Sequence, residues 1–331
     1  MKILMTESED MPSGDSKPTA SWDALRLRAA LLRKLREFFD DRGFLEVETP
    51  ILSADTVVDR HLDPFVTSVP GKPGKLWLQT SPEFAMKRML ATGAGPIYQV
   101  TRSFRRGELG PLHNPEFTIV EWYQPGDGMA EGMQLTSDLC EALLDRGPAD
   151  RVSYAEAFEK HAGLNPHTAE TSALIAKTKE HGIVPPASLS KEDRDGWLDL
   201  LLVERVQPHL GVDCPVLLFD YPASQASLAR VRQDDPPVAE RFELFVGGIE
   251  LANGYHELLD PAELEDRNRC ANAQRIEDGK DPLPEQSRLL EAMRAGLPPS
   301  VGVALGFDRV VMLAAGAKNL SEVMAFPFDR A

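Results

Sequence analysis

The sequence lacks the features of a membrane, secreted or zinc-binding protein. No apolar run among its 331 residues reaches the length of a membrane span, and the apolar stretch near Met1 is too short for a secretory signal. Its three cysteines, Cys140, Cys214 and Cys270, form no CxxC pair, which argues against a zinc site or a disulfide framework and favours the reducing cytoplasm. Aspartate and glutamate (52) outnumber lysine and arginine (36), and the net charge of −16 disfavours nonspecific binding to nucleic acid or to anionic membranes.

What is present is typical of a globular domain. Apolar residues make up 42% of the chain and charged residues 27%, so a sizeable core is available. Residues 1–20 are polar and are expected to be disordered. Ser21 can cap a helix, and apolar side chains then recur at helical spacing up to Phe39. A short strand over 44–48 is expected to follow.

Both helices and strands are expected along the rest of the chain. The patterns predict helices over 81–90, 131–144, 154–161, 172–181, 192–206, 261–278 and 285–295 and from Asp308, and strands over 75–79, 97–102, 117–123, 216–219, 241–247, 249–251 and 301–306. Gly247-Gly248 is a plausible hairpin turn. The region 130–206 shows no catalytic constellation and is interpreted as structural.

The stretch from Ile97 to Tyr123 is predicted to form two strands joined by a polar, glycine-containing loop. A rigid hairpin that presents arginines suits a phosphate-rich ligand, because the guanidinium fork pairs bidentately with phosphate oxygens. An ion-paired surface loop explains the same charges equally well. The loop residues concerned are Arg105, Arg106, Glu108, His113 and Asn114.

Three segments, in this order, resemble the three motifs of class II aminoacyl-tRNA synthetases, most closely those of the lysyl branch. Val47–Pro50 resembles motif 1, Phe104-Arg105 followed by His113–Thr118 resembles motif 2, and Gly302–Arg309 resembles motif 3. The resemblance covers residues 21–331. It implies an α+β catalytic core, in which a mixed, mostly antiparallel sheet is flanked by helices and the motif 1 helix and strand build a homodimer interface.

Lysyl-tRNA synthetases place an anticodon-binding OB-fold before the motif 1 helix. About twenty residues precede that helix here, fewer than the several strands of an OB-fold require. We therefore expect a catalytic core that does not recognise a tRNA anticodon.

The resemblance implies ATP-dependent activation of an amino acid, in which a carboxylate attacks the α-phosphorus and pyrophosphate leaves. Two anions must approach each other, so the protein has to neutralise charge and align the reactants, without a general base. Arg105 matches the arginine at the α-phosphate and the substrate carboxylate, and Arg309 matches the arginine at the γ-phosphate. The alternative for Arg309 is an ion pair with Asp308 at the start of the helix.

Further ATP contacts implied by the resemblance come from Arg106, Gly107, Glu108, His113, Asn114, Phe117, Glu250, Leu251 and Gly306. Phe117 and Arg309 would sandwich the adenine, which Asn114 would read. Gly302 and Gly306 would let the backbone approach the nucleotide. Lysyl-tRNA synthetases have glutamate where this chain has Gly107, so the contact made by Glu108 stays open.

Glu243 and Glu250 flank the Gly247-Gly248 turn and match the metal-binding acids of the family. Mg²⁺ prefers one or two carboxylates together with phosphate oxygens, which this pair would supply. The alternative for Glu243 is an ordinary exposed strand residue.

The residues that the resemblance assigns to the amino-acid substrate are Ser81, Pro82, Glu83, Glu121, Tyr123, Asn253, Glu257 and Ala304. Glu121 and Tyr123 are two apart on a strand and therefore share one face. Together with Glu257 they form a plausible cage for an ammonium, and such a buried site rejects uncharged side chains. Glu83 matches the acid that holds the amine near the carboxylate.

Two substitutions narrow the prediction of the substrate. Ser81 replaces an alanine, and Ala304 replaces the middle glycine of motif 3, a pair that resembles the elongation factor P–(R)-β-lysine ligases, which are truncated paralogues of lysyl-tRNA synthetase. A methyl at Ala304 would crowd an α-amine, and the Ser81 hydroxyl would give a polar partner to an amine one carbon further along. One methyl changes discrimination by about 1–3 kcal/mol. Neutral drift is the alternative.

The resemblance thus implies a cytoplasmic, homodimeric ligase that uses ATP and Mg²⁺. It would activate (R)-β-lysine as an adenylate and pass it to a lysine ε-amine of elongation factor P. The basic residues of the first helix, Arg26, Arg28, Arg33, Lys34 and Arg36, are expected to face solvent rather than a partner.

Two alternatives stay open. A truncated lysyl-tRNA synthetase would charge α-lysine onto tRNA or another acceptor, against which stand the Ser81–Ala304 pair and the missing anticodon domain. A non-catalytic sensor of lysine or ATP need not keep transition-state groups, yet Arg105, Arg309 and both metal-site acids are intact.

Overall fold

One mixed sheet organises the protein, whose computed structural model describes residues 16–71 and 73–331. Within these residues nine strands follow the order β1-β5-β6-β12-β11-β10-β8-β7, with β9 paired to β10. Their bounds are β1 Leu45–Glu46, β5 Ile97–Phe104, β6 Glu116–Pro125, β7 Asp150–Ser153, β8 Val216–Pro222, β9 Val231–Arg232, β10 Val238–Val246, β11 Ile249–His256 and β12 Ser300–Gly306. A smaller sheet consists of β2 Leu52–Ser53, β4 Leu76–Leu78 and β3 Val66–Thr67.

The sheet is antiparallel except for two short edge strands. β1 runs parallel to β5, and β7 runs parallel to β8, whereas the other neighbours are antiparallel. The predicted motif 2 hairpin is present, with Ile97 opposite Tyr123 and Phe104 opposite Glu116. The expected α+β class, with a mixed and mostly antiparallel sheet, is confirmed.

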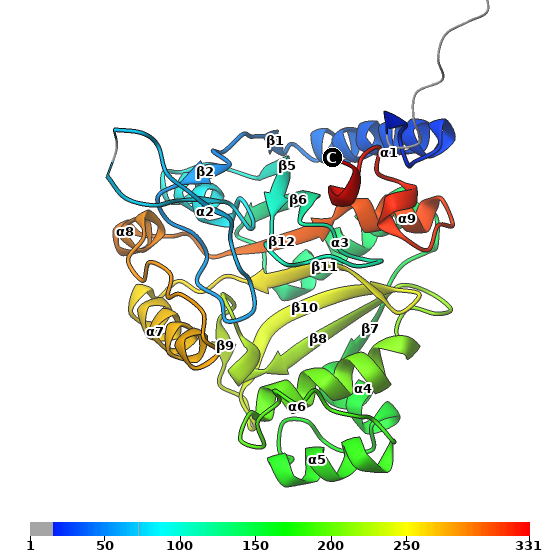
Figure 1. Ribbon diagram of the computed structural model, residues 1–331, viewed down its shortest axis with the longest axis vertical. Coiled ribbons are helices and arrows are strands. Elements are labelled where there is room, and N and C mark those ends of the chain that lie inside the picture. Colours follow the sequence, from blue (N-terminus) through cyan, green and yellow to red (C-terminus); the bar gives the residue numbers. More distant parts are fainter. Residues whose placement is uncertain (1–15, 72) are drawn as a thin grey trace, which may run out of the picture.

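Helices flank the sheet on several sides (Figure 1). Helices α1 and α9 lie side by side at one end, α7 and α8 lie at the opposite end, and α4 to α6 form a separate layer beyond β8. The bounds are α1 Trp22–Asp40, α2 Glu83–Ala91, α3 Met129–Leu144, α4 Tyr154–His161, α5 Thr171–Glu180, α6 Arg194–Leu201, α7 Pro261–Glu277, α8 Arg288–Ala295 and α9 Phe307–Ala314. Each corresponds to a predicted helix within a few residues.

Alternation along the central strands separates the core from the site. On β6, Val120 and Trp122 are buried in the cluster formed with α1, α3 and α9, and each such side chain contributes about 1.5–3 kcal/mol of burial free energy. Glu121 and Tyr123 therefore point to the other face. The same alternation on β12 sends Ala304 to the face that Glu121 occupies, directly opposite it in register.

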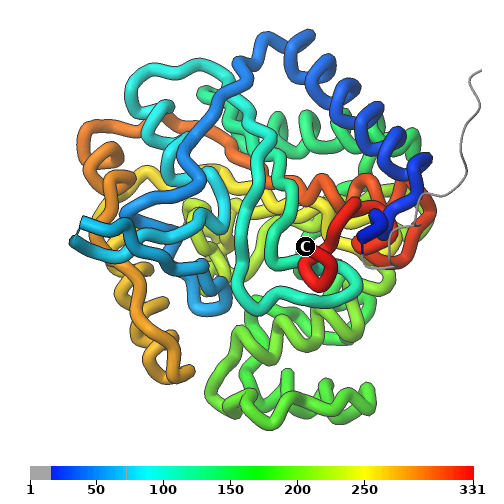
Figure 2. Tube along the Cα trace, turned by 45° about the horizontal axis from the view of Figure 1, so that its top comes forward, coloured from blue at the N-terminus to red at the C-terminus, as the bar shows by residue number. Residues whose placement is uncertain are grey.

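Ser21 caps α1 as predicted, its Oγ accepting a hydrogen bond from the Ala24 N–H at 3.1 Å. The chain just before it is held as well. The Thr19 N–H donates to the Ala325 carbonyl at 2.8 Å, so the C-terminal segment runs beside the start of α1 (Figure 2). Of residues 1–20, which were expected to be disordered, residues 1–15 lie outside the described residues, whereas Thr19 and Ala20 hydrogen-bond to the C-terminal segment.

Arg28 corrects the expectation that the basic residues of α1 face solvent. Its guanidinium donates to Asp308 Oδ1 at 2.5 Å and to Thr118 Oγ1 at 2.6 Å, while Asp308 Oδ2 accepts the Thr118 N–H at 2.7 Å. These bonds join the motif 1 helix to the motif 2 strand and to the first turn of the motif 3 helix. Arg26, in contrast, is solvent-exposed as expected.

No helix within residues 16–71 and 73–331 combines the length and the apolar character that a membrane span requires.

Candidate active site

A cavity of about 690 Å³ opens on the face of the sheet that Glu121 and Tyr123 share. Most of the predicted site residues lie on its wall: Ser81, Glu83, Arg105, Glu108, His113, Asn114, Phe117, Glu121, Tyr123, Glu250, Leu251, Asn253, Glu257, Ala304, Gly306 and Arg309. Residues as far apart in the chain as Ser81 and Arg309 therefore converge on one space, as the three-motif resemblance requires.

Four predicted residues do not line the cavity. Pro82 precedes α2 at its N-cap, and Glu243 is buried within β10. Arg106 is exposed and uses its backbone N–H on the Asp63 carbonyl at 2.7 Å. Gly107 has a φ of +88° in the exposed turn, a conformation that glycine adopts without strain. The motif 2 loop thus turns away from the cavity at the position where lysyl-tRNA synthetases have glutamate.

One end of the cavity is cationic, and Arg309 is fixed there by neutral groups. Its Nη1 donates to the Glu250 carbonyl at 2.7 Å, its Nε to the Leu112 carbonyl at 3.2 Å, and its Nη2 lies 2.9 Å from His113 Nε2. Burial and the nearby Arg309 lower the pKa of His113, so its imidazole is neutral and can accept this hydrogen bond. Asp308 is committed to Arg28, so the alternative Asp308–Arg309 pair does not form.

Arg105, at the start of the motif 2 loop, also lies on the cavity wall. Its guanidinium carbon is 4.9 Å from the centre of the Phe117 ring, and Nη1 is 3.8 Å from Glu108 Oε2. Within the described residues its buried Nε has no hydrogen-bond partner. A buried donor without a partner is unfavourable, so this group is ready for an incoming anion.

Asn114 also holds the motif 2 loop in place. Its Nδ2 donates to the Glu116 carbonyl at 2.6 Å, and its Oδ1 accepts the Phe328 N–H at 2.9 Å. The Oδ1 bond ties the loop to the C-terminal segment. The amide keeps one further N–H and one further lone pair, so its contact with adenine stays a prediction.

The Gly247-Gly248 turn and a β-bulge place the two candidate metal ligands. Both glycines have positive φ, +59° and +74°, as the two-residue type I′ hairpin requires. Glu243 pairs with Asn253, but Phe245 pairs with Glu250, so Leu251 is an extra residue in β11. The bulge brings Glu250 to the face that Glu243 occupies.

These two acids are electrostatically unequal. Glu243 is buried and ion-paired with Arg241, while the Glu250 side chain is 39% exposed and 3.7 Å from Arg309. Burial raises the pKa of Glu243, with a further contribution from Glu250. A divalent cation would relieve this repulsion, so the pair fits Mg²⁺ with Glu250 as the accessible ligand and Glu243 behind it.

The other end of the cavity is a slot of three buried carboxylates. Glu83, Glu121 and Glu257 are 8%, 2% and 1% exposed, and all three line the cavity. The Tyr123 hydroxyl donates to Glu121 Oε1 at 2.6 Å, but within the described residues Glu121 Oε2 has no partner. Lys87 of α2 pairs with Glu83 and Glu257. We name this set of Glu83, Glu121 and Glu257 the ammonium slot.

The ammonium slot is short of positive charge. Burial and the neighbouring Glu83 raise the pKa of Glu121 to about 8, although Tyr123 and Lys87 oppose the shift. Burial also raises the pKa of Glu257 to about 8, against the attraction of Lys87. At neutral pH the empty slot therefore holds protons that a cationic ligand would displace.

Gly302 makes room for the slot, while its expected role beside the nucleotide stays a prediction. A Cβ at this position would lie 2.2 Å from Glu257 Oε1 and 2.3 Å from the Tyr123 ring. Only glycine at this position of β12 leaves room for the side chains of Glu257 and Tyr123. At Gly306 a Cβ would meet only ordinary contacts, the nearest at 3.7 Å, so steric need does not explain that glycine.

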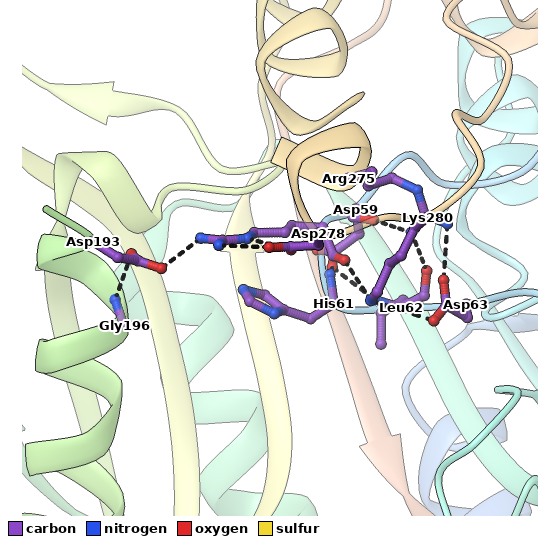
Figure 3. A network of polar contacts seen from close by, with 10 residues as sticks. Asp59, His61, Leu62, Asp63, Asp193, Gly196, Arg275, Asp278 and Lys280 are labelled. Carbon is purple, nitrogen blue, oxygen red and sulfur yellow. Dashed lines mark hydrogen bonds and ion pairs between the residues drawn. The ribbon is translucent and has the colours of Figure 1, made fainter. Parts of the chain in front are cut away.

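An ion-pair network holds the wall near the mouth of the cavity (Figure 3). Arg60 donates to Asp193, the N-cap of α6, at 2.7 Å and to Asp278, beyond α7, at 2.8 Å. Arg275 of α7 donates to Asp63 at 2.8 Å. The segment 59–63 is thereby fixed between two helices that are distant in the sequence, as Figure 3 shows for Asp193 on one side and Asp278 on the other.

Several cavity residues were missed from the sequence. Asp193, Asp195 and Asp199 come from the region 130–206, which we interpreted as structural, and nothing in the local pattern of α6 indicates its contact with the cavity. Two ion-pair partners of predicted site residues were also missed, although their spacing was a signal. Arg241 lies two residues before Glu243 on one strand face, and Lys87 lies four residues after Glu83 on a predicted helix.

Comparison with known proteins agrees with this geometry. The chain is 47% identical over 320 residues to the "Elongation factor P--(R)-beta-lysine ligase" of Salmonella arizonae, covering 95% of this chain and 98% of that protein. Relatives of the same name from Enterobacter sp. and Salmonella gallinarum are also 47% identical, with the same coverage. Residues 16–330 match the family described as tRNA synthetases class II (D, K and N). With its three motifs assembled around one cavity, the chain belongs to this class II tRNA synthetase family.

Proposed function

We propose that this enzyme uses ATP and Mg²⁺ to activate (R)-β-lysine as an aminoacyl-adenylate and transfers it to a lysine ε-amino group of elongation factor P. The observation that carries the proposal is the ammonium slot beside Arg105 and Arg309 in one cavity. The name of the 47% identical relatives supports the amino acid and the protein acceptor.

In the first step a carboxylate oxygen of β-lysine attacks the α-phosphorus, and the bond to the bridging oxygen of pyrophosphate breaks. Arg105 would neutralise the approaching carboxylate and α-phosphate, using the Nε that now has no partner within the described residues. Arg309, already oriented by two carbonyls and His113, would meet the terminal phosphate. Mg²⁺ held by Glu250 and Glu243 would neutralise charge on the leaving pyrophosphate.

The amino groups of the substrate would enter the ammonium slot. Asn253 lies on the same wall, its Oδ1 accepting from Arg241 Nε at 3.3 Å and its Nδ2 donating to the Tyr255 hydroxyl at 3.0 Å. Ala304 is opposite both Asn253 and Glu121 in the sheet register. Its methyl therefore lies on the cavity wall between these two residues, which supports a preference for the displaced amine of β-lysine.

In the second step the acceptor amine attacks the adenylate carbonyl, the bond to AMP breaks, and the nitrogen loses a proton.

We further propose that the enzyme is a cytoplasmic homodimer. Trp22, Leu45 and Ile51 of the motif 1 segment are 69%, 63% and 39% exposed, and a second copy would cover these apolar side chains. Leu45→Glu should lower the mass measured by light scattering from dimer to monomer.

Intact-mass analysis of elongation factor P tests the function. Elongation factor P is incubated with enzyme, ATP and either (R)-β-lysine or (S)-α-lysine. A mass increase of one β-lysyl residue, faster than the increase with α-lysine, is expected, and AMP should appear in equal amount. Aminoacylation of tRNA with α-lysine, without modification of the protein, would overturn the proposal in favour of a truncated lysyl-tRNA synthetase.

A further inference from the structure

Lys87 is a buried cation that contacts the ammonium slot from outside the cavity. It lies one helical turn after Glu83 on α2 and is 2% exposed. Its Nζ is 2.5 Å from Glu83 Oε1 and also pairs with Glu257 Oε2. Lys87 is absent from the cavity wall, whereas both of its partners line it. The slot is therefore open to a ligand and is not filled by this side chain.

The charges of the slot do not balance without a ligand. Three carboxylates face one ammonium, which leaves two negative charges unmatched when all four groups are ionised. Tyr123 adds no charge, since burial and Glu121 raise its pKa well above the usual value. Lys87 remains charged, because Glu257 and Glu83 outweigh its burial and raise its pKa. Glu121 Oε2, 2% exposed as a residue and without a partner in the described chain, marks where charge is missing.

We propose that Lys87 is a positioning residue for the diamino acid: it neutralises one carboxylate of the slot and aligns Glu83 with Glu257, so that two negative charges remain for two ammonium groups. The inference rests on the proposed function, because it concerns how the same site selects its substrate. A ligand with one ammonium leaves a carboxylate unmatched, and a slot without Lys87 leaves one unmatched even when a diamino acid is bound.

The first experiment separates charge from anchoring. Lys87→Gln keeps hydrogen-bond donors for both glutamates but removes the charge, while Lys87→Arg keeps the charge. The KM for (R)-β-lysine in pyrophosphate exchange is measured from pH 6.5 to 9. We expect KM at pH 7 to rise at least tenfold in Lys87→Gln and to recover toward higher pH, while Lys87→Arg stays near the wild type.

Lys177→Met is the matched control, because Lys177 pairs with Glu180 on α5, away from the cavity. It should leave the pH profile unchanged. An unchanged profile in a folded Lys87→Gln enzyme would overturn the inference, as would equal losses in Lys87→Gln and Lys87→Arg, since these would indicate a purely steric anchor.

The second experiment uses the wild type and does not depend on the folding of a variant. Binding of (R)-β-lysine without nucleotide is measured by calorimetry at pH 7 in phosphate and in Tris, whose ionisation enthalpies differ. In the shifts described above, the titratable groups that act on Glu121 and Glu257 are Glu83, Lys87, Tyr123 and, for Glu121, also Glu257, so the two ammonium groups of the ligand should displace more than one proton from the slot. 3-Aminohexanoic acid, which lacks the second amine, should bind more weakly and displace fewer protons. Equal affinities and equal proton release for the two ligands overturn the inference. An enzyme that neither binds nor activates β-lysine at any pH would instead contradict the proposed function.

Discussion

The two ends of the cavity prepare for their ligands in opposite ways. At the cationic end, Arg309 is held by two carbonyls and a neutral histidine, so its charge is oriented before any phosphate arrives. At the acidic end, the carboxylates repel one another and hold protons, which the ammonium groups of a diamino acid would displace. Under the proposed function, one end is therefore preorganised for a transition state, while the other selects the substrate.

This comparison predicts that substitutions at the two ends affect different kinetic constants. The largest effect is expected for Arg309→Ala, which removes a charge aimed at the phosphates. The kcat of pyrophosphate exchange should fall about 10²- to 10³-fold with little change in the KM for β-lysine. Arg26→Ala, which removes an arginine that is exposed on α1, is the control and should leave both constants unchanged. A loss confined to KM would remove the distinction between the ends.

At the acidic end, Glu121→Gln should raise the KM for (R)-β-lysine about 10²-fold while kcat changes less. The amide keeps the shape of the carboxylate but removes the charge that one ammonium needs. Discrimination against 3-aminohexanoic acid, which lacks the second amine, should shrink at the same time. Glu116→Gln, on the same strand but outside the cavity wall, is the control. If kcat falls and KM does not, Glu121 acts on the reaction rather than on selection.

The pH dependence of binding follows from the protons in the slot. Because the pKa values of Glu121 and Glu257 are raised to about 8, the empty folded protein holds protons that the unfolded chain loses above about pH 4.5. These groups therefore lower the free energy of unfolding as the pH rises toward 8. The two ammonium groups of β-lysine displace the protons, so the KM for β-lysine should fall about tenfold per pH unit for each proton released, from pH 6.5 up to about 8. A KM independent of pH over this interval would show that the slot is already ionised when empty.

The smallest effect is expected for Ala304→Gly. Removal of one methyl between Asn253 and Glu121 should shift the preference from β-lysine toward α-lysine about tenfold, as a ratio of kcat/KM values. The variant must be compared with Gly302→Ala on the same strand, which should raise KM for both isomers because its Cβ overlaps Glu257 and Tyr123. An unchanged isomer ratio in Ala304→Gly would rule out the steric explanation of substrate preference.

The sequence predicts features that depend on local pattern. Helix periodicity, the Ser21 cap and the two-glycine turn are correct because each is determined by a few neighbouring residues. The edge strand β7 was missed because Asp150–Ser153 is short and charged, and only its pairing with β8 makes it a strand. Arg28 was misjudged because its partner, Asp308, lies 280 positions away.

For the site too, the sequence predicts what depends on local motifs but not what depends on contacts formed after folding. Motif resemblance placed Arg105, Arg309 and Glu121 on the cavity wall, and their positions agree. It could not show that Asn114 is already engaged on both sides, that Gly302 accommodates the slot, or that α6 supplies part of the wall. Those facts depend on which side chains meet after folding, and no spacing along the chain records them.

The two-residue turn makes the length of the β10–β11 hairpin a matter of parity. Side chains alternate across a sheet, so with this turn kept the gain or loss of one strand residue between Glu243 and Glu250 would turn Glu250 to the face opposite Glu243 and bring an aliphatic neighbour into its place. A change by two residues would restore the carboxylate. Working relatives of this enzyme should therefore vary this hairpin only in even steps, whereas the exposed stretch 184–188 is under no such constraint.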